Sequence, residues 1–221
     1  MSNKYKKRVT YFIASITVLI VLFIIRNVFL NSKYINEIKN DNVYVCGFYG
    51  RYPQKNEQRF YIEFRKNKTF ILVDDNSRGA NDDYDQDGDG SHPYIKIIYG
   101  KYVIDRNNIY ILSKAKSAYV EFKDVGAVKT NKINYYYTRT FNRHEVMPER
   151  VFINNKGNYI LSRTSMDTKT IDKKWYYYIY NKSDIKKLPS SPEEFRKQFK
   201  MDKKAEQERL AEQERLAKQS Q

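Results

Sequence analysis

The sequence predicts a mainly β protein, an antiparallel barrel or sandwich of about nine or ten short strands, with an N-terminal transmembrane helix and a C-terminal solvated helix. Three observations support this. An uncharged apolar run opens the chain, strand-like alternation fills its middle, and a helix-forming charged repeat ends it. The predicted divisions are a basic cytoplasmic N-terminus (1–8), an anchor (9–30), a juxtamembrane linker (31–43), a β-domain (44–183) and a linker with a charged helical tail (184–221).

The apolar run is Val9–Leu30, and no residue from Val9 to Ile25 is charged. At about 1.5 Å of rise per residue, such a helix nearly spans the hydrocarbon core of a bilayer, and a last turn is added if Arg26 extends toward the headgroups. No small residues follow at the spacing of a cleavage site, which disfavours a cleaved signal peptide. A buried core helix would be polar on one face, and this run is apolar nearly all round.

Positive charge is densest before the anchor, at Lys4, Lys6, Lys7 and Arg8. The positive-inside rule then places the N-terminus in the cytoplasm and the C-terminal domain outside the cytoplasmic membrane, in a bacterial-type envelope. The net charge is +15. In that topology a basic surface suits an anionic polymer, lipid headgroups or an acidic protein better than nucleic acid. Alternatively, the surface lysines only keep a β-domain soluble and block edge pairing.

The middle of the chain alternates with a period of two residues, which is typical of half-buried strands. Turn residues separate successive strands, so neighbours should be antiparallel, and the lack of strand–helix alternation argues against a doubly wound sheet. The expected strands are 44–52, Arg59–Arg65, Thr69–Val73, Tyr94–Ile104, Asn108–Ser113, Tyr119–Val125, Ile133–Phe141, Arg150–Ile153, Tyr159–Ser162 and Trp175–Tyr180.

The tail begins with a strong helix-start signal. Ser191 is the expected N-cap, Pro192 suits the first turn, and Glu194 completes a capping box. Phe195 and Phe199 are four residues apart and should pack this turn onto the domain.

A tandem hexapeptide, AEQERL at 205–210 and again at 211–216, follows that turn. Its residues are good helix formers, and Glu206–Arg209 and Glu212–Arg215 are expected to pair. Leu210 and Leu216 lie about 240° apart around a helix, so they form no heptad seam. The sequence therefore favours a solvated helix over a coiled coil.

Residues 83–88, DYDQDG, fit D-x-D-x-D-G and resemble the opening of an EF-hand-type calcium loop. In such loops alternate carboxylates converge on one hard cation, and the glycine permits a sharp turn. The resemblance departs at the twelfth position, where Tyr94 replaces the bidentate Glu, and the flanks are strands. A weak calcium site is one hypothesis, and a solvated acidic loop without a cation is the other. The candidate ligands are Asp83, Asp85, Asp87 and Asp89.

No catalytic residue can be named from the sequence. His92 and His144 lack the spacing of a zinc site, and no nucleophile, phosphate-loop or dinucleotide motif is present. Cys46 is the only cysteine, so no intrachain disulfide forms. We expect a binding or interaction module and not an enzyme. The alternatives are an envelope hydrolase acting on cell-wall or glycan polymers, and a structural partner of an envelope complex through the C-terminal helix.

Overall fold

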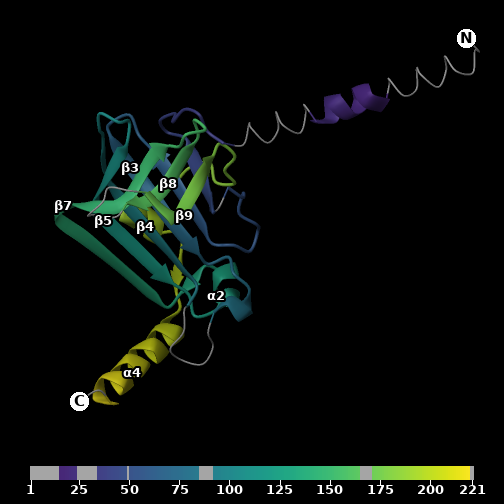
Figure 1. Cartoon of the computed structure of the whole chain (residues 1–221). Helices are drawn as coiled ribbons and strands as arrows, with labels where there is room; N and C mark the ends of the chain where they lie inside the picture. Colours follow the sequence, from purple (N-terminus) through teal and green to yellow (C-terminus); the bar gives the residue numbers. More distant parts are fainter. Residues whose placement is uncertain (1–14, 24–33, 49, 85–91, 165–170, 220–221) are drawn as a thin grey trace, which may run out of the picture.

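The computed structural model describes residues 15–23, 34–48, 50–84, 92–164 and 171–219. Eight strands form a closed antiparallel barrel and follow one another around it in chain order (Figure 1). They are β1 (Val43–Phe48), β2 (Arg59–Phe64), β3 (Thr69–Asn76), β4 (Tyr94–Ile104), β5 (Tyr110–Glu121), β7 (Tyr135–Ile153), β8 (Tyr159–Thr164) and β9 (Ile171–Tyr180). Pairing of β1 with β9, with Val45 opposite Tyr180, closes the ring. The prediction of a mainly antiparallel β-domain is confirmed, and the architecture is a barrel.

Two long strands, β5 and β7, replace four of the expected short ones. The merged predictions are Asn108–Ser113 and Tyr119–Val125 for β5, and Ile133–Phe141 and Arg150–Ile153 for β7. The predicted breaks are wrong because the pairing of β5 with β7 shifts register twice, after Ile111 and after Lys114. Such bulges change the phase of the in–out alternation while the strand continues.

The predicted end of β5 is also wrong at Val125, which opens helix α2 (Val125–Lys129). Asp124 caps that helix, since its side chain accepts a hydrogen bond from the backbone N–H of Ala127 at 2.7 Å. Two glycines lie in and just after β1, at Gly47 and Gly50. A Cβ on Gly47 would lie 2.1 Å from the carbonyl oxygen of Arg51, and Gly50 has a φ of 74°. Only glycine fits the first position, and glycine is favoured at the second.

One end of the barrel interior is filled with side chains, and we call it the closed end. It is the end at which β2, β4 and β7 finish, and its interior residues are Tyr44, Phe64, Tyr102, Tyr110 and Tyr159. Ile35 covers it, with its backbone N–H donating to the carbonyl of Ile179 at 3.1 Å. The chain therefore enters the barrel at its closed end.

A second apolar cluster lies outside the barrel and is covered by the C-terminal segment 181–201. That segment contains α3 (Pro192–Arg196) and β10 (Lys200–Met201), which pairs in parallel with β6 (Lys132–Ile133). Phe195 and Phe199 are buried, and the ring of Phe199 lies 5.7 Å from that of Phe122. The predicted docking of these two phenylalanines is confirmed.

The predicted N-cap of α3 is confirmed as well. The Ser191 hydroxyl accepts from the backbone N–H of Glu194 at 3.2 Å. The other half of the expected capping box is shifted by one residue, because the Glu194 carboxylate accepts from the backbone N–H of Ser190 at 2.7 Å.

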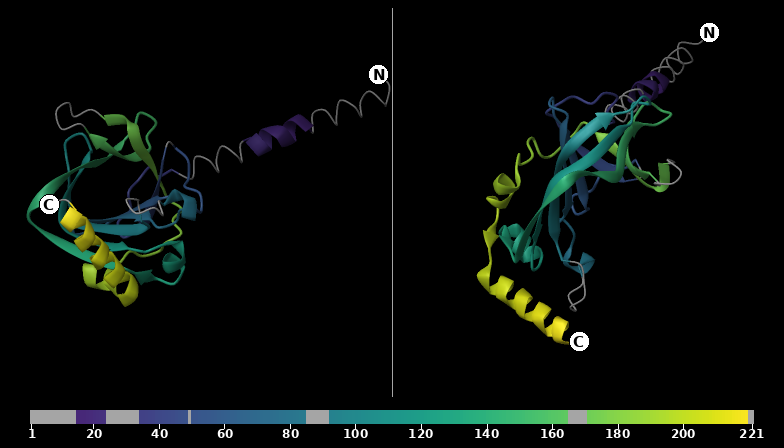
Figure 2. Two further views of the ribbon diagram at one scale, coloured as in Figure 1. Left: turned by 90° about the horizontal axis from the view of Figure 1, so that it is seen from below. Right: turned by 90° about the vertical axis from the view of Figure 1, so that its left-hand side faces the viewer.

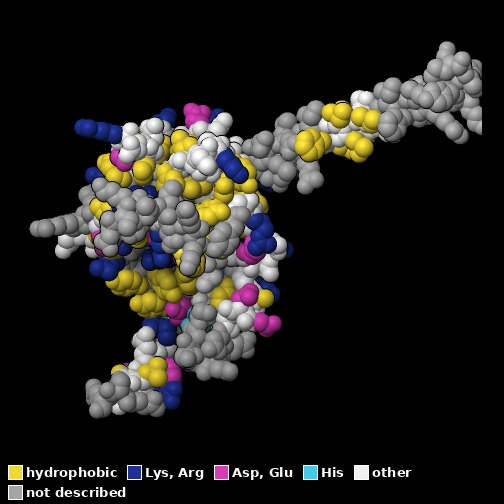
Figure 3. All heavy atoms as spheres, viewed as in Figure 1, with side chains coloured by type: hydrophobic (Ala, Val, Ile, Leu, Met, Phe, Trp, Pro, Cys, Tyr) yellow, Lys and Arg dark blue, Asp and Glu magenta, His cyan; other side chains and the backbone are white. Residues whose placement is uncertain are grey.

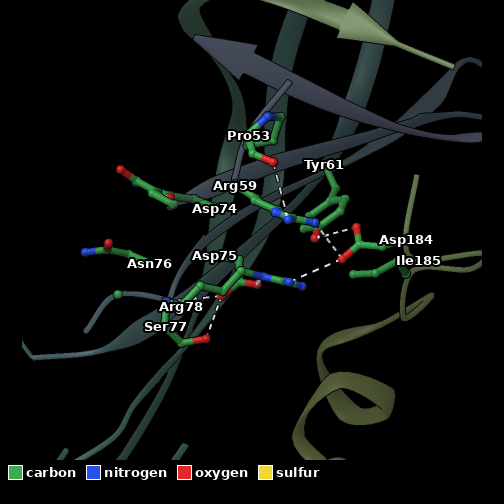
Figure 4. A network of polar contacts seen from close by, with 12 residues as sticks. Pro53, Arg59, Tyr61, Asp74, Asp75, Asn76, Ser77, Arg78, Asp184 and Ile185 are labelled. Carbon is green, nitrogen blue, oxygen red and sulfur yellow. Dashed lines mark hydrogen bonds and ion pairs between the residues drawn. The ribbon is translucent and has the colours of Figure 1, made fainter. Parts of the chain in front are cut away.

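A polar network fastens the C-terminal segment to the outer faces of β2 and β3 (Figure 4). Asp184 bonds to Arg59 at 2.7 Å, to the hydroxyl of Tyr61 at 2.9 Å and to Arg78 at 3.2 Å. Arg78 also pairs with Asp75 at 2.6 Å. Burial acts to raise the pKa of Asp184, but the Tyr61 hydrogen bond and the charges of Arg78 and Arg59 lower it overall. We interpret this network as structural, since every member is used in holding the segment.

Helix α4 (Lys203–Gln219) is mostly exposed, as expected for a solvated tail. The predicted pair Glu212–Arg215 is present at 2.9 Å. The other predicted pair is wrong, because Arg209 turns toward the barrel. Its guanidinium carbon lies 4.3 Å from the ring centre of Tyr135, and its Nε donates to the carbonyl of Asn134 at 3.3 Å.

The predicted anchor, 9–30, falls largely outside the described residues. Its described part, 15–23, is helical and exposes apolar side chains (Figure 3). Within the described ranges no helix is both long and apolar enough to cross a membrane. The anchor stays a prediction.

Candidate functional site

The barrel interior is hollow at the end opposite the closed end, and we call this the open end. A cavity of about 510 Å³ opens there, lined from seven of the eight barrel strands. An eight-stranded barrel is just wide enough either to fill with side chains or to hold one small ligand. Small-molecule sites typically measure roughly 300–1,000 Å³, so this cavity has the size of a ligand site. The left view of Figure 2, seen from below, looks onto this end of the barrel.

The floor of the cavity is apolar and continuous with the interior core. It consists of Leu72, Ile98, Met147 and Leu161, which belong to β3, β4, β7 and β8. None of these side chains is more than 8% exposed. A ligand that reaches the floor therefore meets a surface already shielded from water.

One wall of the cavity is aromatic. The ring of Phe60 lies 4.9 Å from that of Tyr177, and Phe48 packs behind at 5.1 Å from Tyr177 and 5.8 Å from Trp175. Trp175 is 52% exposed, which places the only tryptophan of the chain at the rim. Such a wall offers large apolar faces for stacking.

The rest of the rim is charged. In each of four strands, the inward position next to an apolar interior residue carries a charge. The pairs are Leu72 and Asp74 in β3, Ile98 and Lys96 in β4, Leu112 and Lys114 in β5, and Leu161 and Arg163 in β8. Charged side chains that face a barrel interior destabilise its core. Charges at such positions are therefore expected mainly at functional sites.

The two carboxylates of the rim are already partnered. Asp74 accepts hydrogen bonds from Gln58 at 2.6 Å and from the hydroxyl of Tyr94 at 3.2 Å. Burial raises the pKa of Asp74, and burial together with the Asp74 charge raises the pKa of Tyr94 to about 12. Glu149 pairs with Arg163 at 3.1 Å.

The cations of the rim are less completely partnered. Lys114 pairs with Glu145 at 2.8 Å. Lys96 lies directly opposite Asp74 in the pairing of β3 with β4. Among the residues that the structure describes, however, the Lys96 ammonium makes no ion pair and no hydrogen bond. Lys96 is exposed and lines the cavity, so its ammonium is accessible to a bound ligand.

A shallower hollow of about 440 Å³ continues from the cavity over β5 and β7. It extends across Tyr137, Arg139 and Phe141, and the residues that line both hollows are Asp74, Tyr94, Lys96, Ile98 and Lys114. The guanidinium carbon of Arg139 lies 4.7 Å from the ring centre of Phe141, a cation–π contact. Together the two hollows form one continuous, aromatic and basic surface.

The candidate calcium ligands cannot be assembled from the described residues. Asp83 ends the short helix η1 (Asn81–Asp83) and accepts from the backbone N–H of Ala80 at 2.6 Å. Asp85, Asp87 and Asp89 lie outside the described residues. Among the positions that are described, no three His, Cys, Asp or Glu side chains gather where they could hold a metal. The calcium site stays a prediction.

Sequence reasoning identified none of the cavity residues as a site. Of the triplet Tyr176-Tyr177-Tyr178 only Tyr177 lines the cavity, in agreement with in–out alternation along a strand. The sequence does contain one sign of the cavity, a charged residue two positions from an apolar one, as in Leu72-Val73-Asp74. This pattern indicates a site only when it is known that these two side chains face the barrel interior. Cys46 is buried in the interior, and burial raises the pKa of its thiol, so it is not a reactive group.

The fold and the site define a structural class, an up-and-down barrel of eight strands with one filled end and one open end. No protein-family model, curated protein or solved structure matches the chain. Function is therefore inferred from the cavity and its chemistry.

Proposed function

We propose that this protein is a single-pass, membrane-anchored binding module whose extracytoplasmic barrel takes a small ligand in the cavity of its open end. The observation that carries the proposal is the cavity itself, about 510 Å³ with an apolar floor and an aromatic wall. Side chains that filled this end would add packing contacts to its apolar floor, so an open cavity here is a departure from the packing expected of a scaffold alone.

The predicted topology gives the cavity an orientation. The chain reaches the barrel at Ile35, which packs on the closed end. An anchor over 9–30 would hold that end toward the membrane, and the open end would then face the extracytoplasmic space. A ligand from that space would reach the cavity without crossing the bilayer surface.

A titration that follows Trp175 fluorescence tests the proposal. The full chain in nonionic detergent micelles would be titrated with naphthalene-2-carboxamide, a neutral aromatic probe, and protein-free micelles would measure partitioning. We expect saturable quenching, because Trp175 stands at the rim. The variant Leu72→Phe, which adds volume at the floor, should bind about tenfold more weakly, since it displaces probe from the cavity.

The matched control is Ile153→Phe, which adds a ring at an exposed position of the closed end. It should bind the probe as the unmodified chain does. Quenching that does not saturate, or that Leu72→Phe leaves unchanged, would contradict binding in the cavity.

A second candidate is hydrolysis of a wall or glycan polymer, because Asp74 and Glu149 line the same cavity. Paired carboxylates are the usual catalytic groups of glycoside hydrolysis, and one of them needs a raised pKa to act as an acid. Burial raises the pKa of Asp74. Release of reducing ends from isolated cell walls, abolished in Asp74→Asn and in Glu149→Gln, would support this candidate. Walls left intact by the unmodified chain would dismiss it.

A further inference from the structure

We infer that the ligand of the cavity is a small amphipathic anion. Its apolar ring or chain would lie on the floor and against the aromatic wall, and its carboxylate or phosphate group would contact Lys96 and Arg139. This inference rests on the proposed function, because it assumes that the cavity binds a ligand.

The donors and acceptors of the rim that already have partners indicate the sign of the charge on the ligand. Both carboxylates of the rim accept bonds from protein donors: Asp74 from Gln58 and Tyr94, and Glu149 from Arg163. A cationic ligand would therefore meet carboxylates that already accept bonds from the protein, and the charge of Glu149 is offset by Arg163. An anionic ligand would instead meet donors that have no acceptor yet.

Those free donors belong to Lys96 and Arg139. Within the described part of the chain, neither side chain makes a hydrogen bond or an ion pair. Arg139 stacks on Phe141 and lies near enough to Glu145 to act on its charge, as Lys96 does on Asp74. Lys96 lines both hollows, and Arg139 lines the shallower one. An ionised acceptor bound between them would form charge-assisted hydrogen bonds, which are the stronger kind.

The total charge of the lining points the same way. Lys96, Lys114, Arg139 and Arg163 line the two hollows, against Asp74 and Glu149. The excess of positive charge raises the local concentration of anions and disfavours cations. The aromatic wall alone could accept a cation by stacking, but that cation would lie in a positive field.

The floor explains why a bare inorganic anion is a poor fit. Below the level of Lys96, the cavity is lined by Leu72, Ile98, Met147 and Leu161. An ion that entered there would lose hydration without gaining partners, which is costly. An apolar group attached to the anion fills that space favourably, so the two parts of the cavity select an amphipath.

The test compares naphthalene-2-carboxylate with its neutral isostere naphthalene-2-carboxamide on the full chain in nonionic micelles, following Trp175 fluorescence. We expect the carboxylate to bind about tenfold more tightly, as one charge-assisted hydrogen bond would give. Lys96→Met should weaken carboxylate binding about fivefold and leave carboxamide binding unchanged. The matched control is Lys101→Met, at an exposed position of the same strand that does not line either hollow.

The outcomes separate the inference from the proposed function. If carboxylate and carboxamide bind equally well and Lys96→Met affects neither, the ligand is not an anion, while the cavity remains a binding site. Tighter binding of a cationic isostere, 2-naphthylmethylammonium, would also overturn the inference. If none of the probes quenches Trp175 saturably, the proposed function itself fails.

Discussion

The two ends of the barrel are built from the same eight strands and differ in what those strands turn inward. At the closed end the inward residues are apolar or aromatic, such as Phe64 and Tyr102, and a hollow of about 490 Å³ at that end lies over them, lined mostly by polar residues of the connecting segments. At the open end the same strands turn Asp74 and Lys96 inward and leave a cavity of about 510 Å³. The closed end therefore supplies the stability of the barrel, and the open end carries its candidate chemistry.

This difference explains how a small domain can hold a cavity. The charged rim lies above a floor that is at most 8% exposed, so the apolar core continues directly beneath the cavity. The outer cluster beneath the C-terminal segment buries further apolar surface on the other side of the sheet. Loss of packing at the open end is thus offset elsewhere, which is the usual arrangement for a functional site.

The largest expected effect compares one phenylalanine from each end of β2. Phe64→Ala should lower the free energy of unfolding by about 3–5 kcal/mol, because Phe64 is fully buried in the closed end. Phe60→Ala should cost about 1–2 kcal/mol, because Phe60 borders an existing cavity. Urea unfolding measures both values. Equal costs would mean that the two ends are packed alike.

The network outside the barrel gives a reference that involves neither end. Asp184→Asn should lower the free energy of unfolding by about 1–2 kcal/mol at pH 7, since it weakens a partly exposed charged cluster. The folded-state pKa of Asp184 is lowered, so its stabilisation is complete above the ordinary pKa of 3.8 and is lost as pH falls through the lowered value. Unfolding curves from pH 7 to about pH 2 should show a weaker acid dependence in the variant. If the acid dependence of stability were the same in the variant, Asp184 would not be a source of it.

The next effect concerns the charge of the open end alone. Asp74→Asn should strengthen binding of naphthalene-2-carboxylate about fivefold at pH 7, because it removes a negative charge beside Lys96. In the unmodified chain the affinity should rise as pH falls through the pKa of Asp74, which burial raises, and in Asp74→Asn this rise should vanish. Trp175 titrations across pH measure both. A stronger rise in the variant than in the unmodified chain would contradict this role of Asp74.

The smallest expected effect is on stability. Lys96→Met should change the free energy of unfolding by less than about 0.5 kcal/mol, because Lys96 is exposed and makes no ion pair with described residues. Urea unfolding of the variant checks this. A loss of several kcal/mol would show that the charged rim holds the barrel together and that the division between the two ends is wrong.

Local features of the fold could be predicted from the sequence. The β2–β3 hairpin, the Ser191 cap and the tail helix all depend on residues close together in the chain. The continuity of β5 and β7 could not be predicted, since bulges such as the shift after Lys114 depend on the partner strand. Arg209 likewise contacts Tyr135, which is distant in the sequence, and does not pair with Glu206 in its own helix.

The cavity could not be predicted because it exists only when β9 returns to pair with β1. Until then nothing in Leu72-Val73-Asp74 shows that Asp74 and Trp175 line one cavity. The acidic loop forms a recognisable motif because its residues are adjacent in the sequence, whereas the residues that line the cavity come from seven strands. A site assembled by long-range closure leaves little local signal.

The most direct test of the central claim uses two methionines as reporters. Met147 forms part of the cavity floor, and Met201 lies in β10 outside the barrel. We would record ¹³C-methyl methionine spectra of the full chain in nonionic micelles during addition of naphthalene-2-carboxylate. We expect a saturable shift of the Met147 methyl signal, caused by the nearby aromatic ring, and no shift of the Met201 signal. Shifts of Met201 alone, or of neither signal at saturating probe, would contradict a ligand site at the open end.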